Sequence, residues 1–95
     1  MTLAELRQYR DQIEAIASEH GVVAIRVFGS VARGDAGEQS DVDLLVELEQ
    51  GRGLFDLGAF LADVQELVGE SVDVVTPNGL RSRIRDRVVQ ESVAL

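Results

Sequence analysis

Three parts of this sequence combine residue types that can hold phosphate groups and divalent metal ions. Gly29 and Ser30 end one apolar run, and Asp41 and Asp43 stand one residue apart at the start of the next. A third short apolar run contains another acid, Asp73. A glycine–serine turn offers backbone N–H groups and a hydroxyl to a phosphate, and carboxylates are ligands for hard cations such as Mg²⁺.

The elements around these residues predict that they meet at one edge of a sheet. Val22 to Phe28 and Asp41 to Leu48 are typical of strands, and the short link between them favours antiparallel pairing. The second strand then begins where the first one ends. The apolar helical stripe from Leu54 to Gly69 is long enough for a parallel crossover into a third strand, Ser71 to Thr76. Asp73 is therefore expected beside the paired aspartates.

Carboxylates gathered in this way would repel one another and raise each other's pKa values unless a cation lay among them. Side chains alternate across a strand, so Asp41 and Asp43 point to one side, about 7 Å apart along the backbone. Gly29 would let a phosphate approach closely, and Arg33 would add a positive charge to the phosphate tail. Two Mg²⁺ ions about 3.5–4 Å apart would suit an in-line phosphoryl or nucleotidyl transfer.

The fold class predicted for the whole chain is α/β, with a small mixed β-sheet packed with helices in a single domain of residues 1–95. A capping box formed by Thr2 and Glu5 begins a helix that we expect to run to Gly21. Ser30 stands where the N-cap of a short helical turn would be.

The C-terminal part predicts a turn at Pro77–Gly79 and then a closing amphipathic helix within 80–95. Its apolar residues fall on one side, and arginines lie between them. These arginines are interpreted as the solvated face of the helix, with a basic docking stripe as the alternative. They are Arg81, Arg83, Arg85 and Arg87.

Composition restricts the classes of partner. Seventeen acidic against nine basic residues give a formal charge of −8, which argues against direct nucleic-acid binding and favours a basic protein partner. The absence of cysteine, of a signal-peptide pattern and of a membrane-length apolar run predicts a cytoplasmic protein with no membrane association. A small core would gain stability from a partner, so homo- or hetero-oligomerisation is open.

Each motif also has a purely structural interpretation. The Gly-Ser turn can simply begin a helix, and an Asp-x-Asp pair can be solvated edge decoration. Other acids, such as Asp35, are assigned to solvated loops, and His20 is expected at a helix end because no second histidine exists to share a metal ion. A P-loop is excluded because Asp35 stands where that motif requires lysine.

With Gly29-Ser30, Asp41-Val42-Asp43 and Asp73 in this order, the sequence resembles the nucleotidyltransferase superfamily that includes DNA polymerase beta. The string FGSVARGDAGEQSDVDLLVE is more closely similar to the minimal nucleotidyltransferases, small prokaryotic proteins commonly encoded beside a HEPN-domain protein. The resemblance extends over nearly the whole chain and implies the polymerase beta-like nucleotidyltransferase fold.

The resemblance implies a role for each matched residue. Gly29 and Ser30 would hold a nucleoside triphosphate, and Asp41 and Asp43 would bind two Mg²⁺ ions. Asp73 would bind the second ion and help to deprotonate the acceptor hydroxyl. All matched catalytic positions carry the expected residue, so the resemblance implies an active enzyme.

The implied activity is Mg²⁺-dependent adenylylation, with ATP, of a tyrosine in a HEPN ribonuclease toxin. The chain would then be the antitoxin of a type VII-like toxin–antitoxin pair. Two alternatives stay open: an antitoxin that only binds and occludes the toxin, and transfer of a nucleotide to a small molecule. The choice of ATP comes from the resemblance alone.

Overall fold

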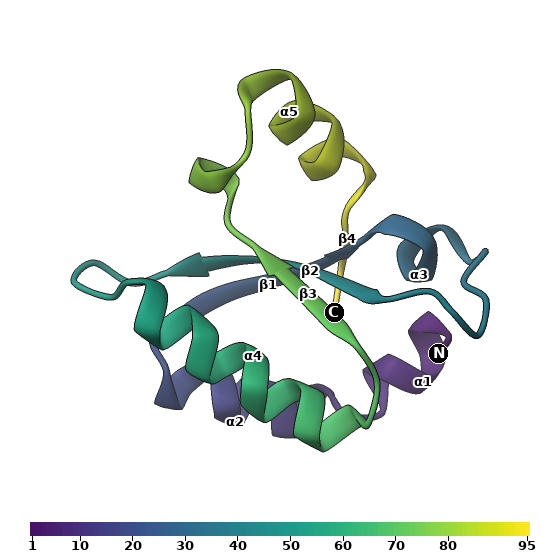
Figure 1. The fold of residues 1–95 in the computed structure, drawn as a ribbon, viewed down its shortest axis with the longest axis horizontal. Helices are drawn as coiled ribbons and strands as arrows, with labels where there is room; N and C mark the ends of the chain where they lie inside the picture. Colours follow the sequence, from purple (N-terminus) through teal and green to yellow (C-terminus); the bar gives the residue numbers. More distant parts are fainter.

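The computed structural model describes residues 1–95 and forms one four-stranded mixed sheet with helices on both faces (Figure 1). In chain order the elements are α1 (Leu3–Arg7), α2 (Arg10–Glu19), β1 (Val22–Phe28), α3 (Gly29–Arg33), β2 (Val42–Leu48), α4 (Leu54–Val68), β3 (Val72–Val75), the 3₁₀-helix η1 (Pro77–Gly79), α5 (Ser82–Glu91) and β4 (Val93–Ala94). The predicted small mixed α/β fold is confirmed. No helix combines the length and apolar character that a membrane crossing requires.

The strand order is β3-β2-β1-β4. The β1–β2 pair is antiparallel and the β2–β3 pair is parallel, as the lengths of the connections predict. A hydrogen bond from the Val42 N–H to the Ser71 carbonyl joins the starts of β2 and β3 at 3.0 Å. The end of β1 therefore lies at the same edge of the sheet as the starts of β2 and β3.

The hydrophobic core lies on the face of the sheet that α2 and α4 cover (Figure 1). Alternate residues of β2, Val42, Leu44 and Val46, are almost completely buried there, together with Phe60 of α4 and Ile13 of α2. Side chains alternate across a strand, so the residues between them in β2 point to the opposite face. The first of these residues is Asp43.

The opposite face of the sheet is only partly covered. Helix α5 stands over it, apart from α2 and α4 (Figure 1), and contributes no buried residue to the core. Even the apolar side chains of Ile84 and Val89 in this helix are about half exposed. The face that carries Asp43 is therefore the open one.

One local prediction is wrong. The N-terminal helix has the predicted capping box at Thr2 and Glu5, but it is interrupted. The N–H groups of Gln8 and Tyr9 bond to carbonyls three residues back, which breaks the i to i−4 ladder and divides it into α1 and α2. The closing helix is confirmed as α5, within the predicted range, and the strand β4 that follows it was not predicted.

The short strand β4 is stabilised by residues far away in the sequence. It pairs antiparallel with Arg26 and Val27 of β1. Arg7 and Arg10 each donate a hydrogen bond of 3.0 Å from Nε to the carbonyl oxygen of Leu95, whose side chain is buried. These contacts extend the predicted three-stranded sheet by one strand on the β1 side.

Candidate active site

The register of the parallel strands places Asp43 of β2 directly opposite Asp73 of β3. Residues paired in this way point to the same face of the sheet, so both carboxylates lie on the open face. Asp41 precedes β2 and, by alternation, points to the same side as Asp43. The structure thus brings the three aspartates to one edge of the sheet, as the sequence predicts.

The three aspartates are close enough for their charges to affect one another. Partial burial raises the pKa of Asp43 above its ordinary value, and the negative charges of Asp73 and Asp41 raise it further. The positive charge of Arg33 acts in the opposite direction. Asp43 is half-buried, whereas Asp41 and Asp73 are exposed. A cation among these acids would therefore stabilise the deprotonated form of Asp43.

Gly29 fits against this cluster because it has no side chain. Its φ of +71° lies in the left-handed region, which residues other than glycine rarely adopt. A Cβ built on Gly29 would collide with the Asp43 carboxylate, and the preceding residue, Phe28, is the β1 partner of Asp43. We expected Gly29 to let a phosphate approach; the group that approaches it here is the carboxylate.

Ser30 does not occupy the predicted N-cap position. It is the second residue of α3, whose N-cap is Phe28, and no side chain caps this helix. The first N–H groups of a helix have no intrahelical partner, so the start of α3 places backbone donors next to Gly29 and Asp43. Ser30 lies in this first turn, beside the end of β1.

Arg33 ends α3 on the same side of the molecule. Its Nε lies 3.3 Å from Asp35 Oδ2, and about half of its side chain is exposed. Its charge also reaches Asp43, as the effect on that pKa shows. Contact between Arg33 and a phosphate would require the guanidinium to exchange Asp35 for the new anion.

The three aspartates do not form the tightest group of potential metal ligands in the protein. The three side chains whose ligand atoms all lie within 4.8 Å of one another are Glu19, His20 and Asp63, between α2 and α4. His20 is the C-cap of α2, so the prediction of a helix-end residue is confirmed, but its partner was not foreseen. The pair is 43 residues apart, and no local pattern in the sequence indicates it.

The donor set at the sheet edge nevertheless suits hard divalent cations. Three carboxylates share one face, and the pKa of one is raised by the other two, so a cation among them would remove an existing repulsion. Mg²⁺ prefers oxygen ligands, keeps several waters and uses only one or two carboxylates per ion together with phosphate oxygens. The three carboxylates are spread over an open edge of the sheet. This arrangement suits two partly hydrated Mg²⁺ ions better than it suits one ion enclosed by protein ligands.

Comparison with known proteins agrees with this geometry. The family model for the nucleotidyltransferase domain matches residues 9–95. The relative MJ0435 of Methanocaldococcus jannaschii is 36% identical over 88 residues, covering 93% of this chain and 95% of the relative. The protein adenylyltransferase MntA of Thermococcus cleftensis is 37% identical over 91 residues, covering 87% of this chain and 92% of the relative.

Solved structures give the same result. A structure assigned to the minimal nucleotidyltransferases superposes with a TM-score of 0.90 at 44% identity and covers 100% of this chain and 97% of that chain. A toxin–antitoxin structure with AMP-PNP has the same fold, with a TM-score of 0.74 at 17% identity over 88% of this chain and 69% of that one. The chain therefore belongs to the nucleotidyltransferase domain family, among its minimal members, and is a nucleotidyltransferase enzyme.

Proposed function

We propose that this nucleotidyltransferase adenylylates a tyrosine of a HEPN-domain ribonuclease toxin, with ATP as the donor and two Mg²⁺ ions. The observation that carries the proposal is the pairing of Asp43 with Asp73 on the open face of the sheet, with Gly29 against Asp43. Relatives support the choice of reaction, because MntA of Thermococcus cleftensis is named a protein adenylyltransferase and structural neighbours are toxin–antitoxin complexes.

Asp41, Asp43 and Asp73 are the residues that would hold the metal ions. When bound, Mg²⁺ would neutralise charge on the attacking and leaving oxygens and fix the triphosphate in line. The chain itself would bind the phosphates through N–H groups at the start of α3 and through the Ser30 hydroxyl. Arg33 would add a positive charge once it leaves Asp35.

The proposed transfer forms one bond and breaks one. The tyrosine hydroxyl oxygen attacks the α-phosphorus of ATP, and the bond from that phosphorus to the oxygen bridging to the β-phosphate breaks. Pyrophosphate leaves with the electron pair, and the hydroxyl proton passes to Asp73. Asp73 is exposed at the sheet edge, where a side chain of a docked protein can reach it.

The open position of the acids favours a protein acceptor over a small molecule. Two cavities, of about 560 and 430 Å³, are lined by other residues and contain none of the three aspartates. An enzyme that modifies a small molecule would enclose its acceptor, since such ligands are usually bound in concave sites that cover most of their surface. A net charge of −8 would further suit a basic ribonuclease as partner.

Intact-protein mass spectrometry of the toxin tests the proposal. The purified chain, ATP and Mg²⁺ should add at least one adenylyl group to the toxin, and peptide mapping should locate it on tyrosine. The double variant Asp41→Asn/Asp43→Asn should add none. Glu47→Gln, which removes an exposed acid from the far end of β2, is the matched control and should retain the activity.

The same double variant also tests the alternative that the chain neutralises the toxin by binding alone. If the double variant suppresses the ribonuclease as well as the unmodified chain does, the toxin is occluded and adenylylation is not the cause. If the unmodified chain leaves the mass of the toxin unchanged in the presence of ATP and Mg²⁺, the proposed acceptor is wrong.

A further inference from the structure

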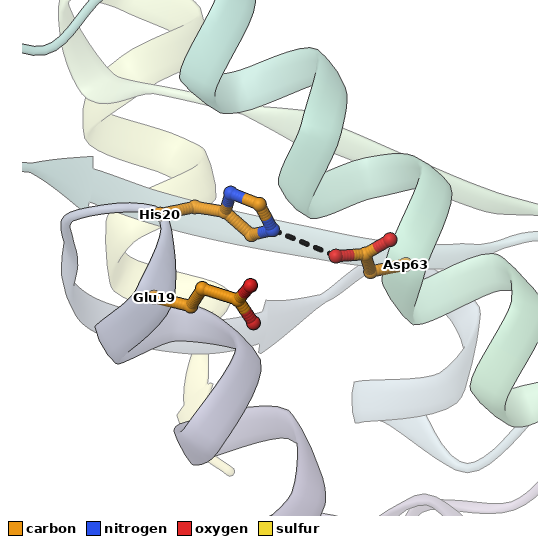
Figure 2. A group of neighbouring side chains, drawn as sticks. All are labelled: Glu19, His20 and Asp63. Carbon is orange, nitrogen blue, oxygen red and sulfur yellow. Dashed lines mark hydrogen bonds and ion pairs between the residues drawn. The ribbon is translucent and has the colours of Figure 1, made fainter.

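Glu19, His20 and Asp63 gather at the junction of α2 and α4 (Figure 2). His20 Nε2 lies 2.7 Å from Asp63 Oδ2, and Figure 2 shows the Glu19 carboxylate beneath the imidazole, directed toward α4. One ligand atom from each side chain lies within 4.8 Å of the other two. Helices α2 and α4 cover the face of the sheet opposite Asp43 and Asp73, so this cluster is separate from the proposed active site (Figure 1).

The negative charge of this cluster is poorly compensated by the protein. Neither Glu19 nor Asp63 forms an ion pair with an arginine; the single recorded partner is His20, which contacts Asp63. The side chain of Arg52 passes beside Gly21, but its guanidinium pairs with two other acids. Two carboxylates thus lie beside a single imidazole and pair with no arginine.

The position of the cluster adds a second preference for positive charge. His20 is the C-cap of the ten-residue helix α2, so the last carbonyl groups of this helix point toward the junction. The C-terminal end of a helix carries partial negative charge and favours cations. The imidazole is also held in place, because only 17% of the His20 side chain is exposed and its Nε2 is directed at Asp63.

We propose that Glu19, His20 and Asp63 bind a divalent transition-metal ion of the Zn²⁺ class, which joins the end of α2 to α4. Zn²⁺ accepts imidazole nitrogen and carboxylate oxygen at about 2.0–2.2 Å, so tetrahedral ligand atoms lie roughly 3.4 Å apart. The distance between His20 Nε2 and Asp63 Oδ2 would need to increase by less than about 1 Å when the ion replaces the proton of their hydrogen bond. Water would complete the coordination.

The ligand types distinguish this ion from the proposed catalytic ions. An imidazole nitrogen suits Zn²⁺ and its neighbours in the first transition series, whereas Mg²⁺ prefers oxygen ligands alone. The bound ion would stabilise the packing of α2 on α4, because it binds the folded chain and finds no such arrangement of ligands in the unfolded one. Acidification would weaken its binding, since a proton competes for the imidazole nitrogen.

Titration calorimetry with ZnCl₂ tests this site without any nucleotide or toxin. The full chain carrying Asp41→Asn/Asp43→Asn is used, so that the proposed catalytic ligands cannot contribute and the result does not depend on the proposed function. We expect one Zn²⁺ per chain and little heat from MgCl₂. At a hundredfold excess over the dissociation constant, Zn²⁺ should raise the melting temperature by on the order of 10 °C.

Two single variants in this background locate the ligands, and a third is the control. Glu19→Gln and His20→Asn should each weaken Zn²⁺ binding by at least about tenfold. Glu66→Gln removes an exposed acid from α4 outside the cluster and should bind as the parent does. Glu19 is exposed and has no ion-pair partner, so its variant stays folded even if His20→Asn does not.

Clear results would overturn the inference. If the Asp41→Asn/Asp43→Asn chain does not bind Zn²⁺, the cluster is only an ion pair between His20 and Asp63 and not a metal site. Equal affinity in the parent and in the folded Glu19→Gln and His20→Asn variants would place the ion elsewhere.

Discussion

The substitution Gly29→Ala adds a methyl group where the structure has the carboxylate of Asp43. Two costs follow. An L-residue held at the φ of +71° found here loses roughly 1–2 kcal/mol relative to its preferred conformations. The new Cβ also forces the Asp43 carboxylate or the end of β1 to move, because the two groups cannot occupy the same space.

Displacement of the Asp43 carboxylate should lower activity more than it lowers stability. Misplacing a reacting group by about 1 Å can reduce a rate by about a hundredfold, so we expect kcat/KM for nucleotidyl transfer to fall by at least about that factor. This corresponds to about 2.7 kcal/mol of transition-state stabilisation. The free energy of unfolding in urea should fall by less. If the Asp43 carboxylate turns away without moving β1, the loss should be close to the cost of the positive φ alone.

A matched control separates the two costs. Gly51 has a φ of +92°, and a Cβ built on it meets nothing within 4 Å. It lies in the loop between β2 and α4, at the other end of the sheet. Gly51→Ala should therefore lose comparable stability and retain its activity. If both variants lose activity equally, or if Gly29→Ala transfers nucleotide at the parent rate, the contact between Gly29 and Asp43 has no catalytic role.

Three further variants follow from the same structure. Folding raises the pKa of Asp43, so the metal-free protein loses stability as pH rises from the ordinary aspartate value of 3.8. Asp43→Asn should therefore raise the melting temperature at neutral pH in EDTA while abolishing transfer. Arg33→Ala should raise KM for MgATP and change the free energy of unfolding by less than about 0.5 kcal/mol. Phe60→Ala removes a fully buried ring and should cost about 3–5 kcal/mol in urea unfolding.

The placement of the acids could be predicted from sequence because it depends on few, local features. Strand alternation sets the face on which Asp43 lies, and the lengths of two connections set the direction of the three strands. The pairing of Asp43 with Asp73 then follows from topology. The end of β1 just before Gly29 could also be predicted from the sequence, because glycine after a β-branched run indicates a change of backbone direction.

Other features depend on contacts between distant parts of the chain. The strand β4 has only two residues, and its position depends on hydrogen bonds from Arg7 and Arg10 to Leu95. The interruption at Gln8 is a change of hydrogen-bond partner within a sequence that has good helical periodicity throughout. The proximity of His20 to Asp63 requires the packing of α2 on α4, which no motif encodes.

A crystal structure with a non-hydrolysable ATP analogue and Mn²⁺ in place of Mg²⁺ would show whether the three aspartates bind the metal ions beside the nucleotide. We expect anomalous peaks for the metal in contact with Asp41, Asp43 and Asp73, with the triphosphate against Gly29 and Ser30. A nucleotide bound elsewhere, or metal ions at that edge of the sheet with no contact to the three carboxylates, would contradict this expectation.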